Sequence, residues 1–189
     1  MALVTAPILP PLLTCARDIE RYVAAAGWDQ PARLFALVTT TDLRATQSEL
    51  GELGELGELG EAGEGGAEAI EPDDLSAVEQ EDLPQEGSLV DLLAQIGWPP
   101  QVQGAAIAVE RIVLPPSAQA DLPQDDEAAL AAVAEHPERE DVRILVAVLR
   151  DGSSTCLLRQ RSNDSDDRVA VGQDIAPGLV EALAETLRD

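Results

Sequence analysis

The spacing of apolar side chains predicts that the chain begins with a helix and a strand. The helix presents one apolar face, formed by Leu12, Ala16, Ile19, Val23 and Ala26. Gly27 followed by Trp28 predicts the end of this helix, because glycine adopts a left-handed turn and the next apolar side chain can pack back on the last helical turn. After Pro31, the short apolar run 34–40 is rich in strand formers and predicts a buried strand.

The same succession of helix, Gly-Trp and strand occurs a second time. Ser88 can cap a helix whose apolar face is Leu89, Leu92, Leu93 and Ile96. Gly97 and Trp98 predict the same kind of helix end, and the apolar stretch 105–114, stopped by two prolines, predicts a strand. Trp28 and Trp98 are the only tryptophans, and an apolar residue after a helix-ending glycine is expected to pack in the core.

The last third of the chain predicts a helix, a hairpin and a closing helix. Asp125 and the acidic residues after it suit the start of a peripheral helix that Pro137 ends. Apolar residues in 142–149 and 155–161 flank an Asp-Gly turn, which predicts a hairpin. Residues 177–187 place apolar side chains at helical spacing behind an initial proline.

This order of elements indicates an α+β fold, because the strands are not uniformly separated by helices. We expect a mixed or antiparallel sheet of about four strands with helices mainly on one face. The hairpin disfavours an all-parallel sheet. Residues 1–47 and 88–189 are predicted to form one discontinuous domain, interrupted by an insertion at 48–87.

The insertion at 48–87 begins with the repeat SELGELGELGELGEAGEGG. Residues 49–86 include 14 acidic side chains and no basic one, so charge repulsion opposes compaction and predicts disorder. Leucines spaced by three with glycine in every triplet do not suit a stable helix. Expansion of a short coding repeat in a tolerant loop is the favoured origin, and an evolved acidic interaction arm is the alternative.

Net charge excludes some classes of partner. The 189 residues include 36 acidic and 12 basic side chains, all of the latter arginine, for a formal charge of −24. A nucleic-acid backbone or an anionic membrane surface would be repelled, so neither is expected as a partner. Two cysteines far apart in sequence and the lack of a recognisable signal peptide favour a cytoplasmic protein.

Residues suited to catalysis are few. His136 is the only histidine and lies near a predicted helix end, where exposure is the expected state. Cys15 lies near Arg17, which could activate its thiol, but a buried structural cysteine is commoner, and Cys156 alternates onto the core side of its strand. The acidic stretch 163–167 does not have the spacing of a calcium loop. We therefore expect no catalytic residue, metal or cofactor.

The predicted hairpin places Arg143, Arg159 and Arg161 together on one face of the sheet, opposite its valine-rich face. One interpretation is that nearby acids such as Glu110 simply neutralise these arginines. The alternative is a binding surface that the acidic insertion covers, or for which it competes with an acidic partner.

The chain resembles a family of uncharacterised actinobacterial proteins in four stretches: DIERYVAAAGWDQPARLFALVTTTDL, IGWPPQVQGAAIAVERIVLPP, REDVRILVAVLRDGSSTCLLRQR and VGQDIAPGLVEAL. The family brings no assigned activity or catalytic residues. In topology alone, the leading helix, small sheet and closing helix resemble secretion-chaperone-like and YbjN-like domains. That resemblance implies a protein-binding role, often as a dimer.

The sequence thus favours a non-catalytic cytosolic protein-binding or chaperone-like adaptor module. Its partner would be another protein, bound through the sheet face bearing Arg159 and Arg161, or a second copy of the chain in a homodimer. The alternative is an enzyme or small-ligand sensor with a pocket near Trp28 and Trp98, using His136 or Cys15. A third hypothesis makes the acidic insertion a flexible binding element for basic partners.

Overall fold

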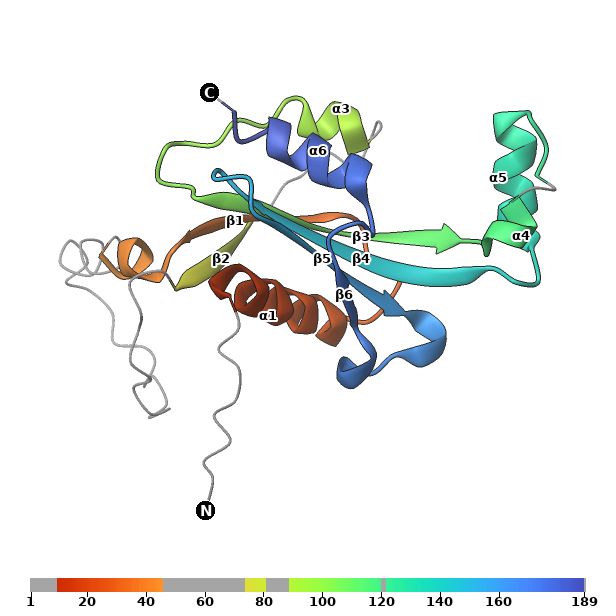
Figure 1. Ribbon diagram of the computed structural model, residues 1–189, viewed down its shortest axis with the longest axis horizontal. Helices are drawn as coiled ribbons and strands as arrows, with labels where there is room; N and C mark the ends of the chain where they lie inside the picture. Colours follow the sequence, from red (N-terminus) through yellow and green to blue (C-terminus); the bar gives the residue numbers. More distant parts are fainter. Residues whose placement is uncertain (1–9, 46–73, 81–88, 120–121, 189) are drawn as a thin grey trace, which may run out of the picture.

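A helix precedes the first strand and another follows the last in the computed structural model, which describes residues 10–45, 74–80, 89–119 and 122–188 (Figure 1). The elements in chain order are α1 (Pro11–Ala25), β1 (Arg33–Thr39), β2 (Leu75–Gln80), α3 (Leu89–Leu93), β3 (Gly104–Val113), α4 (Pro116–Gln119), α5 (Asp126–Glu135), β4 (Glu140–Leu149), β5 (Ser154–Gln160), η1 (Arg161–Asn163), η2 (Asp166–Arg168), β6 (Ala170–Gly172) and α6 (Pro177–Glu185).

The described strands form one antiparallel sheet in the order β2-β1-β3-β4-β5-β6. The α+β class and the antiparallel pairing are confirmed, but the expected number of about four strands is wrong, because the sheet has six. One added strand, β2, comes from inside the stretch interpreted as an insertion and pairs with β1. The other, β6, has only three residues, too few to show a pattern. The rest of the predicted insertion, at 48–73 and 81–87, lies outside the described residues.

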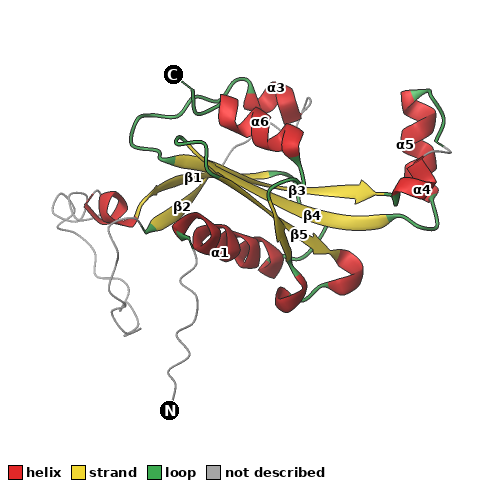
Figure 2. Cartoon of the chain, in the orientation of Figure 1, coloured by secondary structure: helices red, strands yellow, loops and turns green. Residues whose placement is uncertain are grey.

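Helices cover both faces of the sheet, so the expectation that they lie mainly on one face is wrong (Figure 2). The face against α1 buries Phe35, Leu37, Ala106, Leu145 and Leu157. The face against α3 and α6 buries Leu34, Ile107, Val146 and Cys156, which pack in one cluster with Leu183 of α6. The central strands contain continuous apolar runs, 104–109 in β3 and 144–149 in β4, and a strand needs such a run only when both of its faces are covered.

The predicted chain reversals are confirmed at two of three glycines. Gly27 ends α1 with a φ of 85°, and Gly152 turns the β4–β5 hairpin with a φ of 88°. The Asp151 carboxylate fixes that turn by accepting a hydrogen bond of 2.8 Å from the Ser153 amide. Gly97 does not adopt a positive φ, and α3 ends earlier, at Leu93. The second Gly-Trp pair therefore follows a short helix without the left-handed stop that the first pair makes.

Strands β3 and β4 continue together beyond the end of β1, with β5 paired to β4 as far as Val142, and α4 and α5 lie at the outer end (Figure 1). They pair from Gly104 with Leu149 to Val113 with Glu140, whereas β1 pairs with β3 only over 104–108. The Asp125 side chain caps α5 by accepting a hydrogen bond of 2.9 Å from the Ala128 amide, as its sequence suggests.

Gly104 is required where the chain enters β3, because a Cβ there would fall on the Val148 carbonyl oxygen and the Leu149 side chain. We expect Gly104→Ala to lower the free energy of unfolding by about 1–3 kcal/mol, measured by urea denaturation. Gly97→Ala is the matched control, since its Cβ would meet nothing within 4 Å, and it should stay within about 0.5 kcal/mol of the wild type. Equal stability of the two variants would contradict the close packing at Gly104.

Candidate functional site

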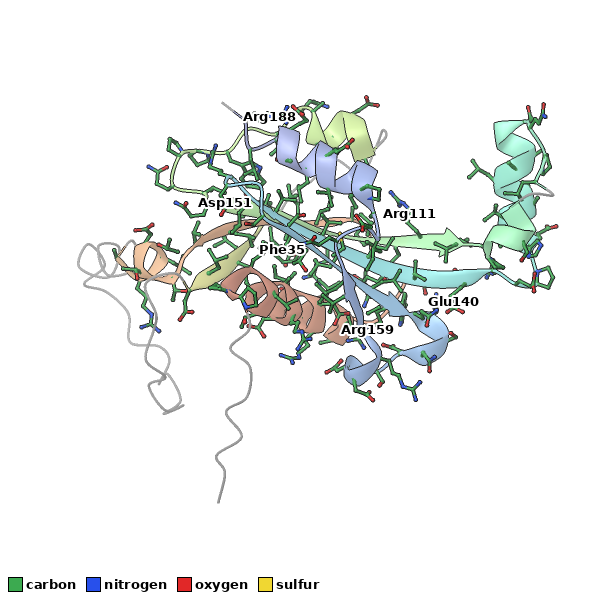
Figure 3. The ribbon with its side chains drawn as sticks, viewed as in Figure 1. Phe35, Arg111, Glu140, Asp151, Arg159 and Arg188 are labelled. Carbon is green, nitrogen blue, oxygen red and sulfur yellow. The ribbon has the colours of Figure 1, made fainter. Side chains whose placement is uncertain are left out.

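Two of the predicted site residues, Arg143 on β4 and Arg159 on β5, lie directly opposite each other in the sheet register. Val146 and Cys156 are paired in the same way and belong to the other face, as the alternation predicts. Both arginines are buried, with 2% and 3% of their surface exposed, on the side of the sheet that α1 covers. Figure 3 labels Arg159 on this side. They do not form an exposed cationic surface.

Arg159 is held by three carboxylates. Its guanidinium forks onto Glu20 of α1, with Nε to Oε1 at 2.6 Å and Nη2 to Oε2 at 2.7 Å, and Glu20 is itself only 3% exposed. Asp164 and Asp166, from the segment after β5, accept further hydrogen bonds of 2.9 and 2.6 Å. Glu20 foremost, then the two aspartates, raise the pKa of Arg159 above its already high ordinary value. The pairs join α1, β5 and the segment that follows β5.

Trp28 lies beside the same network. Its indole Nε1 donates a hydrogen bond of 2.8 Å to Asp164, and the Arg143 and Arg161 guanidinium carbons lie 4.5 and 5.6 Å from the ring centroid. Arg161 in turn forks onto Asp29, with both N–O distances at 2.8 Å. The hydrogen bond from Trp28, followed by Arg159, lowers the pKa of Asp164. We call Trp28, the three arginines and their acidic partners the Trp28–arginine cluster: Trp28, Arg143, Arg159, Arg161, Glu20, Asp29, Glu110, Asp164 and Asp166.

Glu110 neutralises Arg143, as the simpler interpretation of the sequence proposed. Its Oε1 lies 2.7 Å from Nη2 of Arg143, which also donates to the Gly27 carbonyl oxygen. Nε and Nη1 of Arg143 have no hydrogen-bond partner among the described residues. Every arginine of the Trp28–arginine cluster thus faces a carboxylate, and the cluster ties α1, three strands and two loops together. A binding role for these residues stays a prediction.

Trp98 lies on the other side of the sheet. Its indole Nε1 donates a hydrogen bond of 2.9 Å to Thr186, and its ring packs in the cluster that includes Leu93 and Leu183. Trp28 is instead joined to groups on the α1 side. The structure therefore does not bring the two tryptophans to one common pocket.

A hollow of about 470 Å³ lies between α1, β1 and β2, where the sequence predicted no site. It is lined by Cys15, Asp18, Ile19, Tyr22, Phe35, Leu43, Leu75, Ser76, Ala77 and Glu79. The sequence did not predict the hollow, because β2 forms one of its walls and the acidic composition around β2 predicted an insertion instead of a strand. The one local signal was a short group of apolar residues, Leu75, Ala77 and Val78, within the acidic stretch.

Arg33 and Tyr22 fasten β2 beside this hollow by binding Glu79. Arg33 forks onto the carboxylate with Nε to Oε1 at 2.6 Å and Nη2 to Oε2 at 2.7 Å, and the Tyr22 hydroxyl donates to Oε2 at 2.9 Å. The Arg33 guanidinium also lies 4.6 Å from the Tyr22 ring centroid. Arg33 foremost, with a smaller contribution from Tyr22, lowers the pKa of Glu79. We call these three residues the Glu79 clamp.

Cys15 does not have the surroundings of an activated thiol, and His136 lies in a turn after α5. Burial, and then the charge of Asp18, raise the pKa of Cys15 to about 11, so the thiol is protonated near neutral pH. The His136 Nδ1 accepts a hydrogen bond of 3.1 Å from the Glu138 amide in a turn. The described residues contain no group of three or more side chains suited to a metal ion, and none of their helices is long and apolar enough to cross a membrane.

A family model described as PPA1309-like protein matches residues 12–188. The match includes the whole Trp28–arginine cluster, the hollow and the Glu79 clamp. PPA is a locus tag of Propionibacterium acnes, and the description gives no function, so the predicted resemblance to an uncharacterised actinobacterial family is confirmed. Comparison with curated proteins and with solved structures found no match. The looser resemblance to secretion-chaperone-like and YbjN-like domains stays a prediction.

Breaking the buried ion pair between Arg159 and Glu20 should destabilise the fold. Arg159→Met leaves the Glu20 carboxylate buried without its cation, and we expect a loss of about 3–5 kcal/mol in urea denaturation. The double variant with Glu20→Met should recover most of this loss, because no buried unpaired charge remains and the carboxylates of Asp164 and Asp166 are exposed to solvent. Arg161→Met, which removes an exposed pair with Asp29, is the control and should cost less than about 1 kcal/mol. If Arg159→Met lowers the free energy of unfolding no more than Arg161→Met does, the pair between Arg159 and Glu20 does not stabilise the fold.

The raised pKa of Cys15 should make its alkylation slow. Because the thiolate is the reacting form, we expect iodoacetamide to modify Cys15 at pH 8 at least about a hundredfold more slowly than an unstructured thiol peptide. The rate should keep rising with pH beyond pH 9. Peptide mapping by mass spectrometry distinguishes Cys15 from the fully buried Cys156, which serves as the internal reference. A rate that levels off near neutral pH would instead indicate an activated nucleophile.

Proposed function

This chain belongs to the PPA1309-like family, and we propose that it is a non-catalytic protein-binding module whose binding surface is the outer edge of β2 with the adjoining hollow. The proposal rests on one observation: β2 is a six-residue edge strand beside a largely apolar hollow. Main-chain groups at such an edge can pair with an added strand, and a neighbouring pocket can select its side chains.

The hydrogen-bond pattern shows which residues of β2 face outward. The Thr40 amide donates to the Asp74 carbonyl oxygen at 2.8 Å, in continuation of the β1–β2 register. Since backbone groups alternate in direction along an antiparallel ladder, Ser76, Val78 and Gln80 face β1. The backbone groups of Leu75, Ala77 and Glu79 then point away from it. Among the described residues, no strand lies beyond β2.

The opposite edge of the sheet is less suited to strand addition. It is formed by β6, which has three residues, half the length of β2. Very short edge strands are one way in which proteins avoid unwanted pairing. The contrast between the edges supports β2 as the binding side.

Side chains of an added strand would alternate between the two faces of the sheet. Those on the α1 side would lie beside Leu75, Ala77 and Glu79, which line the hollow. The hollow can therefore accept side chains, whereas the backbone edge supplies affinity that depends little on sequence. Peptide-binding modules that add a strand to a sheet combine the same two contributions, affinity from the backbone edge and selectivity from a side-chain pocket.

The chemistry of the remaining candidates supports a non-catalytic role. The arginines that were first expected to bind a partner are paired with carboxylates, so we place the surface at β2 instead. The alternative, an enzyme or sensor with a pocket near Trp28 and Trp98, is weakened by their separation on opposite faces. The buried unpaired thiols of Cys15 and Cys156 support the proposal that the protein acts in the reducing cytoplasm.

Ala77→Pro should abolish partner binding without unfolding the protein. Proline removes an outward N–H and obstructs an added strand, while the ladder to β1 stays intact because proline is tolerated where an edge N–H faces solvent. Ala77→Ser keeps the N–H and is the matched control. We expect immobilised wild type and Ala77→Ser to retain a common partner from an actinobacterial lysate, and Ala77→Pro to retain at least about tenfold less.

The same partner should slow amide exchange at residues 75–80, which locates the contact. Urea denaturation should place Ala77→Pro within about 1 kcal/mol of the wild type. Equal capture by Ala77→Pro and Ala77→Ser, with unchanged exchange at 75–80, would overturn the proposed surface.

A further inference from the structure

We propose that the occupant of the β2 edge is an extended basic segment of another protein, in which apolar residues alternate with lysine or arginine. This inference rests on the proposed function above and adds the chemical class of the partner. It combines the charge of the chain around β2, the lining of the hollow and the exposure of the strand's other side.

Charge selects against an acidic partner and against a second copy of the chain. β2 lies within residues 49–86, where the sequence has 14 acidic side chains and no basic one, in a chain of formal charge −24. Such a field attracts a cationic segment during encounter and repels an anionic one. Two copies paired through β2 would bring two of these acidic stretches to one edge.

The hollow favours an apolar side chain from the added strand. Ile19, Phe35 and Leu75 provide apolar walls, and Cys15 is 5% exposed with its thiol protonated. Tyr22 meets Phe35 edge to face, with ring centroids 6.3 Å apart, and is itself 55% exposed. The partly open tyrosine ring extends the apolar wall toward solvent, so a leucine-like side chain would remove it from water.

The acidic side chains that line the hollow do not form a dedicated site for one basic side chain of the ligand. Glu79 is bound by Arg33 and Tyr22 in the Glu79 clamp. Asp18, at the rim, is 66% exposed and pairs with Arg21, itself 57% exposed, so this pair can exchange partners at little cost. Basic side chains of the ligand are therefore expected to act through the overall field rather than through a buried salt bridge.

The other side of β2 suits the basic positions of the alternation. Val78 there is 37% exposed, on the side away from α1. Because residues of a strand alternate between faces, an added strand with apolar side chains in the hollow must direct its remaining side chains to the side on which Val78 is exposed. Lysine and arginine can lay their aliphatic stems on Val78 while their charged ends stay in water.

Synthetic peptides test this inference on the full chain. The probe is a short capped peptide alternating lysine with leucine and valine. The comparison peptides are its glutamate analogue and a version N-methylated at every residue, which has no backbone N–H to pair as a strand on either edge. Fluorescence anisotropy measures affinity, and the alkylation rate of Cys15 reports occupancy of the hollow.

We expect the lysine peptide to bind wild type and Ala77→Ser, to slow Cys15 alkylation, and to bind more weakly as salt is added. Ala77→Pro and the N-methylated peptide should each weaken binding by at least about tenfold, and the glutamate analogue should bind no better than these.

Three results would overturn the inference. If the lysine peptide binds Ala77→Pro as well as wild type, or does not bind at all, the β2 edge does not select a basic strand. If lysine and glutamate peptides bind equally and both lose affinity in Ala77→Pro, the basic preference is wrong while the proposed function stands. If the protein is a dimer that Ala77→Pro dissociates, the occupant is a second copy.

Discussion

The Glu79 clamp is the interaction on which the candidate binding surface depends. β2 lies between acidic stretches and places few apolar side chains on the sheet, so hydrophobic burial contributes little to its attachment. Arg33 from β1 and Tyr22 from α1 both bind the Glu79 carboxylate, and Arg33 is largely shielded from solvent, with 15% of its side chain exposed. A charge-assisted fork in this partly buried position is stronger than a surface pair. It fixes β2 as the sheet edge and sets the width of the hollow beside α1.

Three arginines join elements in the buried or partly buried parts of the fold, whereas most of the other arginines are exposed. Arg33, Arg143 and Arg159 are each paired with a carboxylate that comes from another strand or helix. These pairs hold strands and helices together in addition to the hydrophobic core. Because the paired arginines are already neutralised, the excess of acidic residues determines the electrostatic field around the protein. The same use of arginine thus explains why the expected cationic surface is missing at Arg143 and Arg159 and why a basic partner fits the chain.

The sequence predicted what depends on local periodicity, and it did not predict what depends on distant partners. The alternation in 142–149 placed Arg143 and Arg159 on one face correctly, and Gly27 and Gly152 marked real left-handed turns. Strand β2 was not predicted, because the acidic composition of 48–87 outweighed a strand pattern of only six residues. The strand forms because it pairs with β1 and because the Glu79 clamp holds it there. Glu20 was not recognised as the partner of Arg159, since nothing in the sequence links a helix position to a strand 139 residues later.

Residue-resolved amide exchange on the native protein tests the central claim most directly. If the Glu79 clamp holds β2 as an edge strand, the amides of Ser76, Val78 and Gln80 should be protected, while those of Leu75, Ala77 and Glu79 exchange quickly. Replacing Arg33 with methionine should remove the protection of the first three. Uniformly fast exchange across 75–80 in the wild type, or equal protection of all six amides, would contradict the account.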